Sequence, residues 1–477
     1  MAEANQMKSE HSDLPETGVP DDKSHGKAVF IVAAISSFAA TFMGSAVNVA
    51  SPRIGEDFSL SAVAMGWIVT AYLLSAAVSL LPAGRIADII GKKEVFVLGM
   101  GIFAFSSLVS ALSTSYAVLL ASRVVAGVGS AMGFATGTAI LVSTVALKDR
   151  GRILGWNVAS VYLGLSLGPP LGGIITHVLG WQWIFIASAV AGLLTVALAM
   201  WALKKDSVPA RGESFDVTGS FLCGLALICI LFGLTRLTMP LGIALLVGGG
   251  VCAILFARWE YRSKSPLIDI RAFSRNPAFV FSNLAALINY SATAAVVFLL
   301  SLYLQYQKGF TVQDAGLILV VQPIVMVLVS PLSGRLSDRI EPGTLASVGM
   351  ALTVAVLVGF SFLHADTNLW LIVGGLALLG FSFGLFSSPN MNAVMSSVER
   401  RHYGVASSTL AAMRVVGQTL SMGIATLIMT LFLGAARIQI TNLPDFMASM
   451  RVAFAVFAAL CVIGVIASLA RGRQLSS

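Results

Sequence analysis

Charged side chains are scarce in this sequence. Only 11% of its 477 residues are Asp, Glu, Lys or Arg, whereas about 25% is usual for a globular domain. Hydrophobic residues make up 57% of the chain, which is more apolar surface than a soluble core could bury. The scarcity of charge therefore excludes an ordinary soluble domain and indicates a protein that lies in a lipid bilayer.

Several kinds of chemical site are also missing. Four cysteines fall inside apolar runs without a CxxC spacing, so we expect no disulfide and no metal site. The phosphate-binding pattern GxxxxGK[ST] does not occur, which argues against a pump driven by ATP. No histidine or carboxylate is expected at membrane depth, so an enzyme site in the membrane would have no base. A carrier driven by a gradient, without a cofactor, is left as the main class, with a channel or receptor as the alternative.

Long apolar runs fill most of the chain. A bilayer core about 30 Å thick requires about 20 apolar residues per helix. Transmembrane β-strands are excluded, because the runs are about twice as long as such strands and do not alternate apolar with polar residues. The sequence therefore predicts an all-α polytopic membrane protein. Its fourteen expected helices lie at 28–50, 60–83, 94–113, 115–142, 155–178, 181–203, 217–236, 239–257, 277–304, 312–333, 343–363, 369–392, 404–434 and 449–470.

Basic residues in the loops set the expected orientation. Of 30 Lys and Arg residues, 23 fall in the N-terminal tail, in the C-terminal tail and in alternate loops on the same side, whereas 5 fall on the opposite side. This asymmetry places both termini in the cytoplasm of a prokaryotic cell, with the chain crossing the inner membrane many times. It also explains the basic composition, so no nucleic-acid partner is required.

An internal repeat divides the chain. The segment GRIAD at 84–88 returns as GRLSD at 334–338, and each copy ends the second helix of a possible six-helix unit. Two repeated bundles around a midplane site are an architecture of secondary transporters. We expect a disordered cytoplasmic tail at 1–26, a six-helix bundle at 27–203, two linker helices at 204–276 and a second six-helix bundle at 277–477.

Motifs on these helices resemble those of the major facilitator superfamily, in its fourteen-helix drug:proton antiporter branch. GRIADIIGKK at 84–93 resembles the GxLaDrxGrK signature. Arg123, Gly127 and Gly129 match the RxxqGxg signature of helix 4, with Ala126 where Gln is usual. Residues 164–173 match the GxxxGPxxGG signature of antiporters. Four further segments are similar to that branch: WIVTAYLL at 67–74, WQWIF at 181–185, FLLSLYLQ at 298–305 and SPNMNAV at 388–394.

This resemblance covers nearly the whole chain after the tail. It implies export of drugs or similar amphipathic compounds in exchange for protons, by a protein that acts as a monomer. On physical grounds the repeated loop has a functional interpretation as a latch, in which a carboxylate is held against a basic group or a helix N-terminus of the other bundle. The plain alternative is a solvated ion pair worth about 0–1 kcal/mol. The residues expected to serve in this gating are Gly84, Asp88, Gly91, Lys92, Asp338 and Arg339.

Glycines at four-residue spacing on helix 5 predict close helix packing, because small residues let backbones approach in lipid. We also expect the prolines that follow Gly168 to free carbonyl groups and bend the helix, which would create a pivot and a seal. Gly84 and Gly91 are expected to bracket Asp88 in a tight turn. The helix 5 residues assigned to gating are Gly164, Gly168, Pro169 and Gly172.

Two arginines lie deep in the predicted spans, where an ionisable residue costs at least about 2.5 kcal/mol and so suggests a function. For Arg123 the alternatives are coupling, together with Gly127, or a structural pairing with backbone carbonyls. None of the 22 carboxylates is expected at depth. Met43 stands where the resembling branch has an acidic residue, so coupling would fall to a rim carboxylate such as Asp57 or Asp314.

Polar groups in the apolar runs are the candidates for contact with a small-molecule substrate, although each could equally hold helices together. The missing acid at Met43 leaves a second interpretation open. The protein would then export a neutral or anionic metabolite, which would meet Arg414, with coupling that uses no helix 1 carboxylate. The expected cavity residues are Asn48, Tyr72, Asn157, Asn289, Gln322, Asn390, Arg414 and Gln418.

Overall fold

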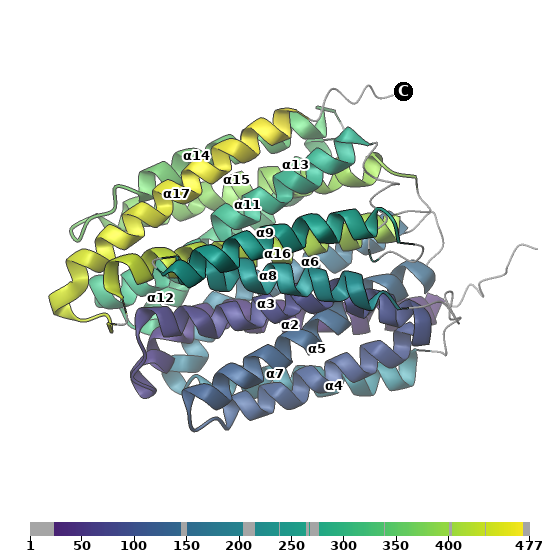
Figure 1. Cartoon of the computed structure of the whole chain (residues 1–477), viewed down its shortest axis with the longest axis horizontal. Coiled ribbons are helices and arrows are strands. Elements are labelled where there is room, and N and C mark those ends of the chain that lie inside the picture. The colour runs from purple at the N-terminus through teal and green to yellow at the C-terminus, as the bar shows by residue number, and fades with distance from the viewer. Residues whose placement is uncertain are drawn as a thin grey trace, which may run out of the picture.

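The chain forms a bundle of long, roughly parallel helices (Figure 1). The computed structural model describes residues 23–144, 150–203, 215–237, 239–263, 267, 276–337, 339–399, 403–434 and 436–470. The helices of these residues are α2 (Lys23–Asp57), α3 (Ala62–Ile90), α4 (Lys92–Ala111), α5 (Tyr116–Thr144), α6 (Arg150–Val178), α7 (Gln182–Ala202), α8 (Val217–Thr235), α9 (Pro240–Glu260), α11 (Pro277–Leu302), η1 (Tyr303–Gln307), α12 (Val312–Leu319), α13 (Val321–Leu336), α14 (Pro342–Phe360), α15 (Leu369–Ser396), α16 (Tyr403–Leu433), η3 (Ile440–Asn442) and α17 (Leu443–Leu469).

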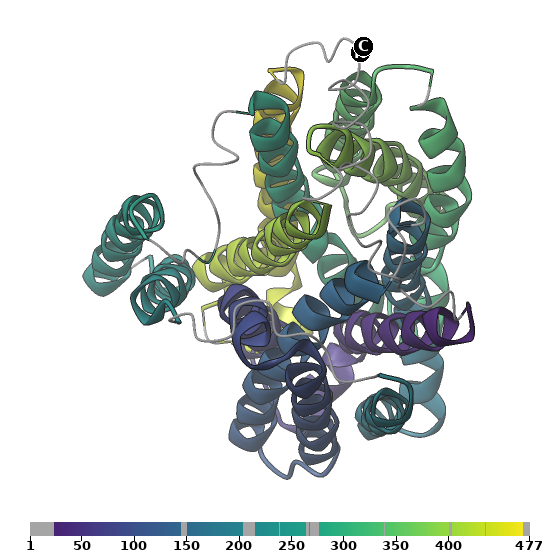
Figure 2. The ribbon, with the colours of Figure 1, turned by 90° about the vertical axis from the view of Figure 1, so that its right-hand side faces the viewer.

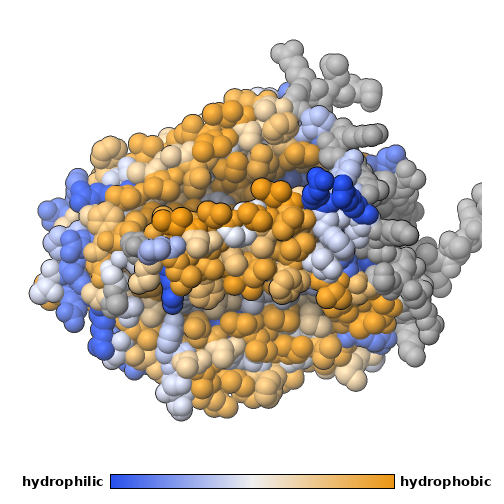
Figure 3. All heavy atoms as spheres, in the orientation of Figure 1, coloured by the Kyte–Doolittle hydropathy of each residue, from blue (hydrophilic) through white to orange (hydrophobic). Residues whose placement is uncertain are grey.

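Fourteen spans in the described residues are long and apolar enough to cross a membrane, which confirms the predicted number. A broad apolar band covers the face in Figure 3, and hydrophilic residues gather beyond it toward both ends of the helices. The end that carries both termini of the described chain, at the right of Figure 1, is called the terminal end below. The opposite end, where α2 and α3 are joined, is called the far end.

The helices form two bundles with a helical hairpin beside them. In the first bundle α2 packs on α6, and α5 packs on α3 and α4. In the second bundle α11 packs on α16 and α17, and α15 packs on α13 and α14. The hairpin of α8 and α9 lies at the side of the molecule (Figure 2), where α8 touches α3 and α16. The structure therefore has the two six-helix bundles and the two inserted helices that the sequence predicts.

Polar side chains cap several helices where the apolar runs begin. Ser61 Oγ accepts the Ala64 N–H at 3.2 Å at the start of α3. Asp216 Oδ1 accepts the Gly219 N–H at 2.8 Å at the start of α8, and Thr311 caps α12. Each cap satisfies a backbone N–H that has no partner within its own helix.

Glycines let α6 lie directly on α2. A Cβ added to Gly164 would lie 2.6 Å from the carbonyl oxygen of Phe38, and a Cβ added to Gly172 would lie 2.8 Å from Cα of Ala46. Gly168 makes an equally close approach to α2. A larger side chain at these positions would force the two helices apart, which is the physical reason for the four-residue glycine spacing.

The structure departs from the sequence prediction at three places. Helix α3 continues through Gly84 to Ile90, so the expected tight turn around Asp88 is wrong and the turn lies at Gly91 alone, whose φ is 127°. Helix α11 ends in the π-helix η1. The predicted run at 312–333 is divided between α12 and α13. Helix α6 continues through Pro169, and the bend expected there stays a prediction.

Candidate functional site

Two cavities lie between the bundles. The first, called the central cavity, has a volume of about 160 Å³ and is lined by α2, α3, α5 and α6 of one bundle and by α11, α13, α15 and α16 of the other. The second, called the terminal-end cavity, has a volume of about 540 Å³ and is lined by residues nearer the terminal end. The two cavities share Phe134, Tyr290 and Arg414. These three residues therefore mark the point where the cavities meet.

Arg414 carries the charge of this site. Its Cζ lies 5.6 Å from the centre of the Phe134 ring, across the boundary between the bundles. In the described part of the chain, Arg414 is the one charged side chain in the lining of the two cavities, which includes no Asp, Glu, Lys or His. A guanidinium remains protonated at any physiological pH. The cavities are thus positively charged at their junction.

A group of hydroxyls bridges the bundles beside Arg414. The Tyr162 hydroxyl of α6 contacts the Ser387 hydroxyl of α15 and lies 3.3 Å from the Tyr290 hydroxyl of α11. The Tyr290 ring meets Phe383 edge-on, with centroids 5.5 Å apart. These contacts bring hydroxyls from both bundles, and the aromatic surface of Tyr290, into the cavity that Arg414 lines.

Several predicted cavity residues line these spaces. Asn48, Tyr72, Gln322 and Gln418 line the central cavity. Tyr72 is also held in place, because its hydroxyl donates to the carbonyl oxygen of Ala40 at 3.0 Å. These positions agree with the expectation that polar groups inside the apolar runs face the space between the bundles.

The remaining predicted residues are divided between the second cavity and the helix interior. Asn157 and Asn390 line the terminal-end cavity. Asn390 Nδ2 donates to the carbonyl oxygen of Ser282 at 3.3 Å, and Asn157 Oδ1 accepts from Ser37 at 3.2 Å. Asn289 is fully buried in α11 and lines neither cavity. Sequence alone could not separate Asn289 from the others, because all are amides in apolar runs.

At the far end the two bundles touch through backbone. A Cβ added to Gly316 of α12 would lie 2.4 Å from the carbonyl oxygen of Pro169, and one added to Gly173 would lie 2.7 Å from that of Val312. Gln305 Nε2 donates to the carbonyl oxygen of Val49 at 3.1 Å across the same boundary. The far end is therefore closed between α6 and α12. No sequence pattern marks Gly316, because it is a single glycine in a short helix and has no spaced partner.

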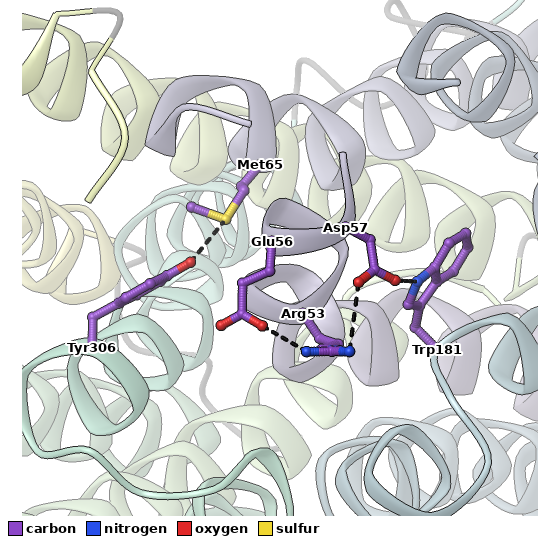
Figure 4. A network of polar contacts seen from close by, with 6 residues as sticks. All are labelled: Arg53, Glu56, Asp57, Met65, Trp181 and Tyr306. Atoms are coloured by element: carbon purple, nitrogen blue, oxygen red, sulfur yellow. Dashed lines mark hydrogen bonds and ion pairs between the residues drawn. The ribbon is translucent and has the colours of Figure 1, made fainter. Parts of the chain in front are cut away.

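The rim carboxylates lie at the far end, Asp57 at the end of α2 and Asp314 in the first turn of α12; Figure 4 shows the surroundings of Asp57. Asp57 accepts a hydrogen bond from Trp181 Nε1 at 2.8 Å and lies 3.7 Å from Arg53, so its partners belong to its own bundle. Asp314 accepts from the Thr311 hydroxyl at 2.7 Å, as part of the α12 cap. Neither carboxylate lines the central or terminal-end cavity.

A third cavity, called the far-end cavity below, lies beside these carboxylates. It has a volume of about 500 Å³ and is lined by Glu56 and His177 of the first bundle and by Gln305 and Tyr306 of η1. Tyr306 also points across the boundary toward the sulfur of Met65, at 3.9 Å (Figure 4). Glu56 is therefore the carboxylate that faces the space between the bundles at this end.

Arg123 is completely buried in the first bundle. Its Nε donates to the carbonyl oxygen of Ile68 at 3.1 Å, and its Cζ lies 4.4 Å from the centre of the Tyr72 ring and 5.7 Å from that of Phe185. Among the described residues, neither terminal nitrogen has a hydrogen-bond partner. Gly127, one turn away, packs against the backbone of α3. Arg123 thus links α5 to α3 and lines neither cavity.

The predicted latch lies at the terminal end. Asp88 is half-buried in the last turn of α3, Gly91 separates α3 from α4, and Lys92 begins α4. Arg339 is exposed after α13. Asp338, its predicted neighbour in the latch, lies outside the described residues. The structure thus places this segment at the same end of the molecule as the terminal-end cavity.

Comparison with known proteins decides the family. The family model described as Major Facilitator Superfamily matches residues 33–422. The chain belongs to the major facilitator superfamily. Its resemblance to the drug-efflux branch is supported by relatives named for drug resistance, including the multidrug resistance protein Stp of Mycobacterium tuberculosis, which is 27% identical over 82% of this chain and 73% of the relative.

Other major facilitator relatives differ in the substrates for which they are named. The riboflavin transporter RibZ of Clostridioides difficile is 32% identical over 81% of this chain and 84% of the relative. Among solved structures, a bacterial homologue of the human lysosomal transporter Spinster superposes with a TM-score of 0.67 at 15% identity, over 94% of this chain and 98% of that chain. This likeness shows the shared fold. The protein is accordingly a multi-pass membrane transporter of this superfamily.

Proposed function

We propose that this protein exports amphipathic small molecules, including drugs, from a prokaryotic cell in exchange for protons. The observation that carries the proposal is the pair of cavities between two bundles that touch through backbone at the far end. Such an arrangement suits alternating access, in which two bundles rock about a fixed site. Relatives named for resistance to several antibiotics support an exporter.

The orientation belongs to the same proposal. The excess of Lys and Arg in the loops at the terminal end supports an orientation with that end and both chain termini in the cytoplasm, and with the far end outside the inner membrane. The larger terminal-end cavity, whose lining includes the amides of Asn157 and Asn390, then faces the cytoplasm, from which an exporter collects its substrate. The protein would act as a monomer in the lipid bilayer, without a cofactor, an enzymatic activity or a nucleic-acid partner.

Proton coupling requires a titratable group, and α2 has no carboxylate in its apolar part, residues 28–50. Met43, at the position of the missing acid, is fully buried and accepts a hydrogen bond from Ser107 at 3.6 Å. We therefore assign coupling to the far-end rim. Asp57 and Asp314 are the carboxylates predicted from sequence, and Glu56 joins them because it lines the far-end cavity.

A second function is favoured by the charge of the cavities. The lining described above carries Arg414 and no carboxylate, so export of a neutral or anionic metabolite is the alternative to export of cationic drugs. The relative named as a riboflavin transporter provides one neutral aromatic compound to test. Coupling in this case would likewise not use a carboxylate within the apolar run at 28–50.

Proteoliposomes with an imposed pH gradient test both functions. We expect gradient-driven movement of ethidium for the first function and of riboflavin for the second, with loss of either movement when a protonophore collapses the gradient. Glu56→Gln, Asp57→Asn and Asp314→Asn would each be compared with the unaltered protein, and one of them should uncouple transport. Movement of neither compound under any gradient would contradict the proposal.

A further inference from the structure

We infer that the junction of the two cavities binds planar aromatic acids, with the acid group on Arg414 and the ring in the central cavity. This inference rests on the export function proposed above and specifies the chemical class of the exported compound. It is carried by the position of one charged group, by the hydroxyls around it and by the different character of the two cavities.

The charge of Arg414 selects an anion. In the described residues no carboxylate lines either cavity, and no hydrogen bond or ion pair joins the Arg414 guanidinium to another side chain. A charge in a site of low dielectric is costly unless it is paired. A carboxylate ligand would provide that pair in a bidentate geometry. An organic cation would instead meet a like charge at short range.

The surroundings of Arg414 strengthen the preference for an acceptor group. Tyr162, Tyr290 and Ser387 bring three hydroxyls together on the terminal-end side of the junction. Hydroxyls can donate to a carboxylate oxygen, and such charge-assisted hydrogen bonds are stronger than neutral ones. An acid group at the junction would therefore receive donors from both bundles, because Tyr162 lies on α6 and Tyr290 on α11.

The two cavities differ in a way that orients the ligand. Toward the far end, the central cavity is mostly apolar, with Leu73, Val297 and Met326 among its lining residues. Toward the terminal end, the lining of the second cavity includes several amides and hydroxyls, those of Asn157, Tyr162, Ser387, Ser388, Asn390 and Asn392. The apolar part of an amphipathic ligand is thus drawn into the central cavity while its polar part stays at the junction.

Aromatic rings at the junction favour a planar ligand. Phe134 lies on the first-bundle side, and Tyr290 and Phe383 form an edge-on pair on the other side. A flat ring can stack or meet such rings edge-on, which adds to the gain from burying its area. The Arg414 Cζ lies over the Phe134 ring, and a carboxylate would meet the donor nitrogens in the plane of the guanidinium.

Binding of three naphthalene compounds to the purified full-length protein in nanodiscs tests the inference. 2-Naphthoate, 2-naphthamide and 2-naphthylmethylammonium share one ring system and differ in the charge of the head group. We expect the carboxylate to bind best and the ammonium worst, with about 10- to 100-fold between them. Arg414→Gln should remove this difference, and Arg414→Lys should restore part of it. Arg437→Gln, an identical change on an exposed far-end loop, is the matched control.

A second variant, Phe134→Leu, keeps the inference testable if Arg414→Gln does not fold. Phe134→Leu should lower the affinity for all three compounds by a similar factor, because the ring and not the head group loses a contact. Equal or tighter binding of the ammonium compound by the unaltered protein would overturn the inference while leaving export possible. The same holds for a carboxylate preference that survives in Arg414→Gln. Binding of no compound, together with no transport of ethidium or riboflavin, would overturn the export function as well.

Discussion

Gly316→Ala should prevent the far end from closing fully. The added Cβ would lie 2.4 Å from the carbonyl oxygen of Pro169 and 3.2 Å from its carbon. Both atoms belong to backbone, so neither can rotate away and the helices α6 and α12 must separate. Overpacking of this kind costs about 1–3 kcal/mol, which is about a 5- to 150-fold shift between two conformations. The closed conformation bears this cost, and the open one does not.

Accessibility of the far-end cavity measures the shift. Thr176 is 5% exposed and lines that cavity, so a cysteine placed there in a cysteine-free background reports opening. We expect a membrane-impermeant maleimide to label Thr176→Cys about 5- to 150-fold faster when Gly316→Ala is present. Gly374→Ala is the control, because it makes the same change inside a helix with no neighbouring atom within 4 Å. Equal labelling rates in the two variants would refute the role assigned to the close contact.

Two further predictions concern single polar side chains, one buried and one at a helix start. Arg123→Met should leave the thermal unfolding midpoint unchanged or raise it, because it removes a fully buried charge that makes a single hydrogen bond within the described residues. A midpoint lower by several degrees would show that the guanidinium stabilises the first bundle. Thr311→Ala should cost about 1 kcal/mol by removing the α12 cap, visible as a lower midpoint. Thr344→Ala removes a hydroxyl whose side-chain contact is longer, 3.3 Å, and is the control; equal midpoints would contradict the capping role.

The fold was predictable because membrane helices are marked by length and hydrophobicity together. Fourteen apolar runs became fourteen spans, since a backbone in lipid must satisfy its hydrogen bonds within each helix. The boundaries were less predictable. Helix α2 runs on to Asp57 past Arg53 and Glu56, because a helix can continue beyond the apolar core once its polar side chains reach water or form ion pairs.

The candidate site was predictable in residue type and not in arrangement. Asn48, Gln322 and Gln418 line the central cavity, because a polar group in an apolar run is costly unless it faces a cavity or a partner. The pairing of Tyr162 with Tyr290 joins residues of different bundles, and no local pattern encodes such a contact. The closure at Gly316 likewise depends on how two bundles meet.

The two ends of the site differ in how ligand binding can affect them. At the far end, closure comes from close backbone packing between α6 and α12, where the acid group of a ligand on Arg414 has no hydrogen bond to replace. Toward the terminal end, the bundles are joined beside Arg414 by the hydroxyls of Tyr162, Tyr290 and Ser387. A ligand that accepts hydrogen bonds from these hydroxyls competes with the contact between the bundles. Because a ligand shifts a conformational equilibrium only through contacts that differ between states, the hydroxyl group is where binding at the junction acts on the relative position of the bundles.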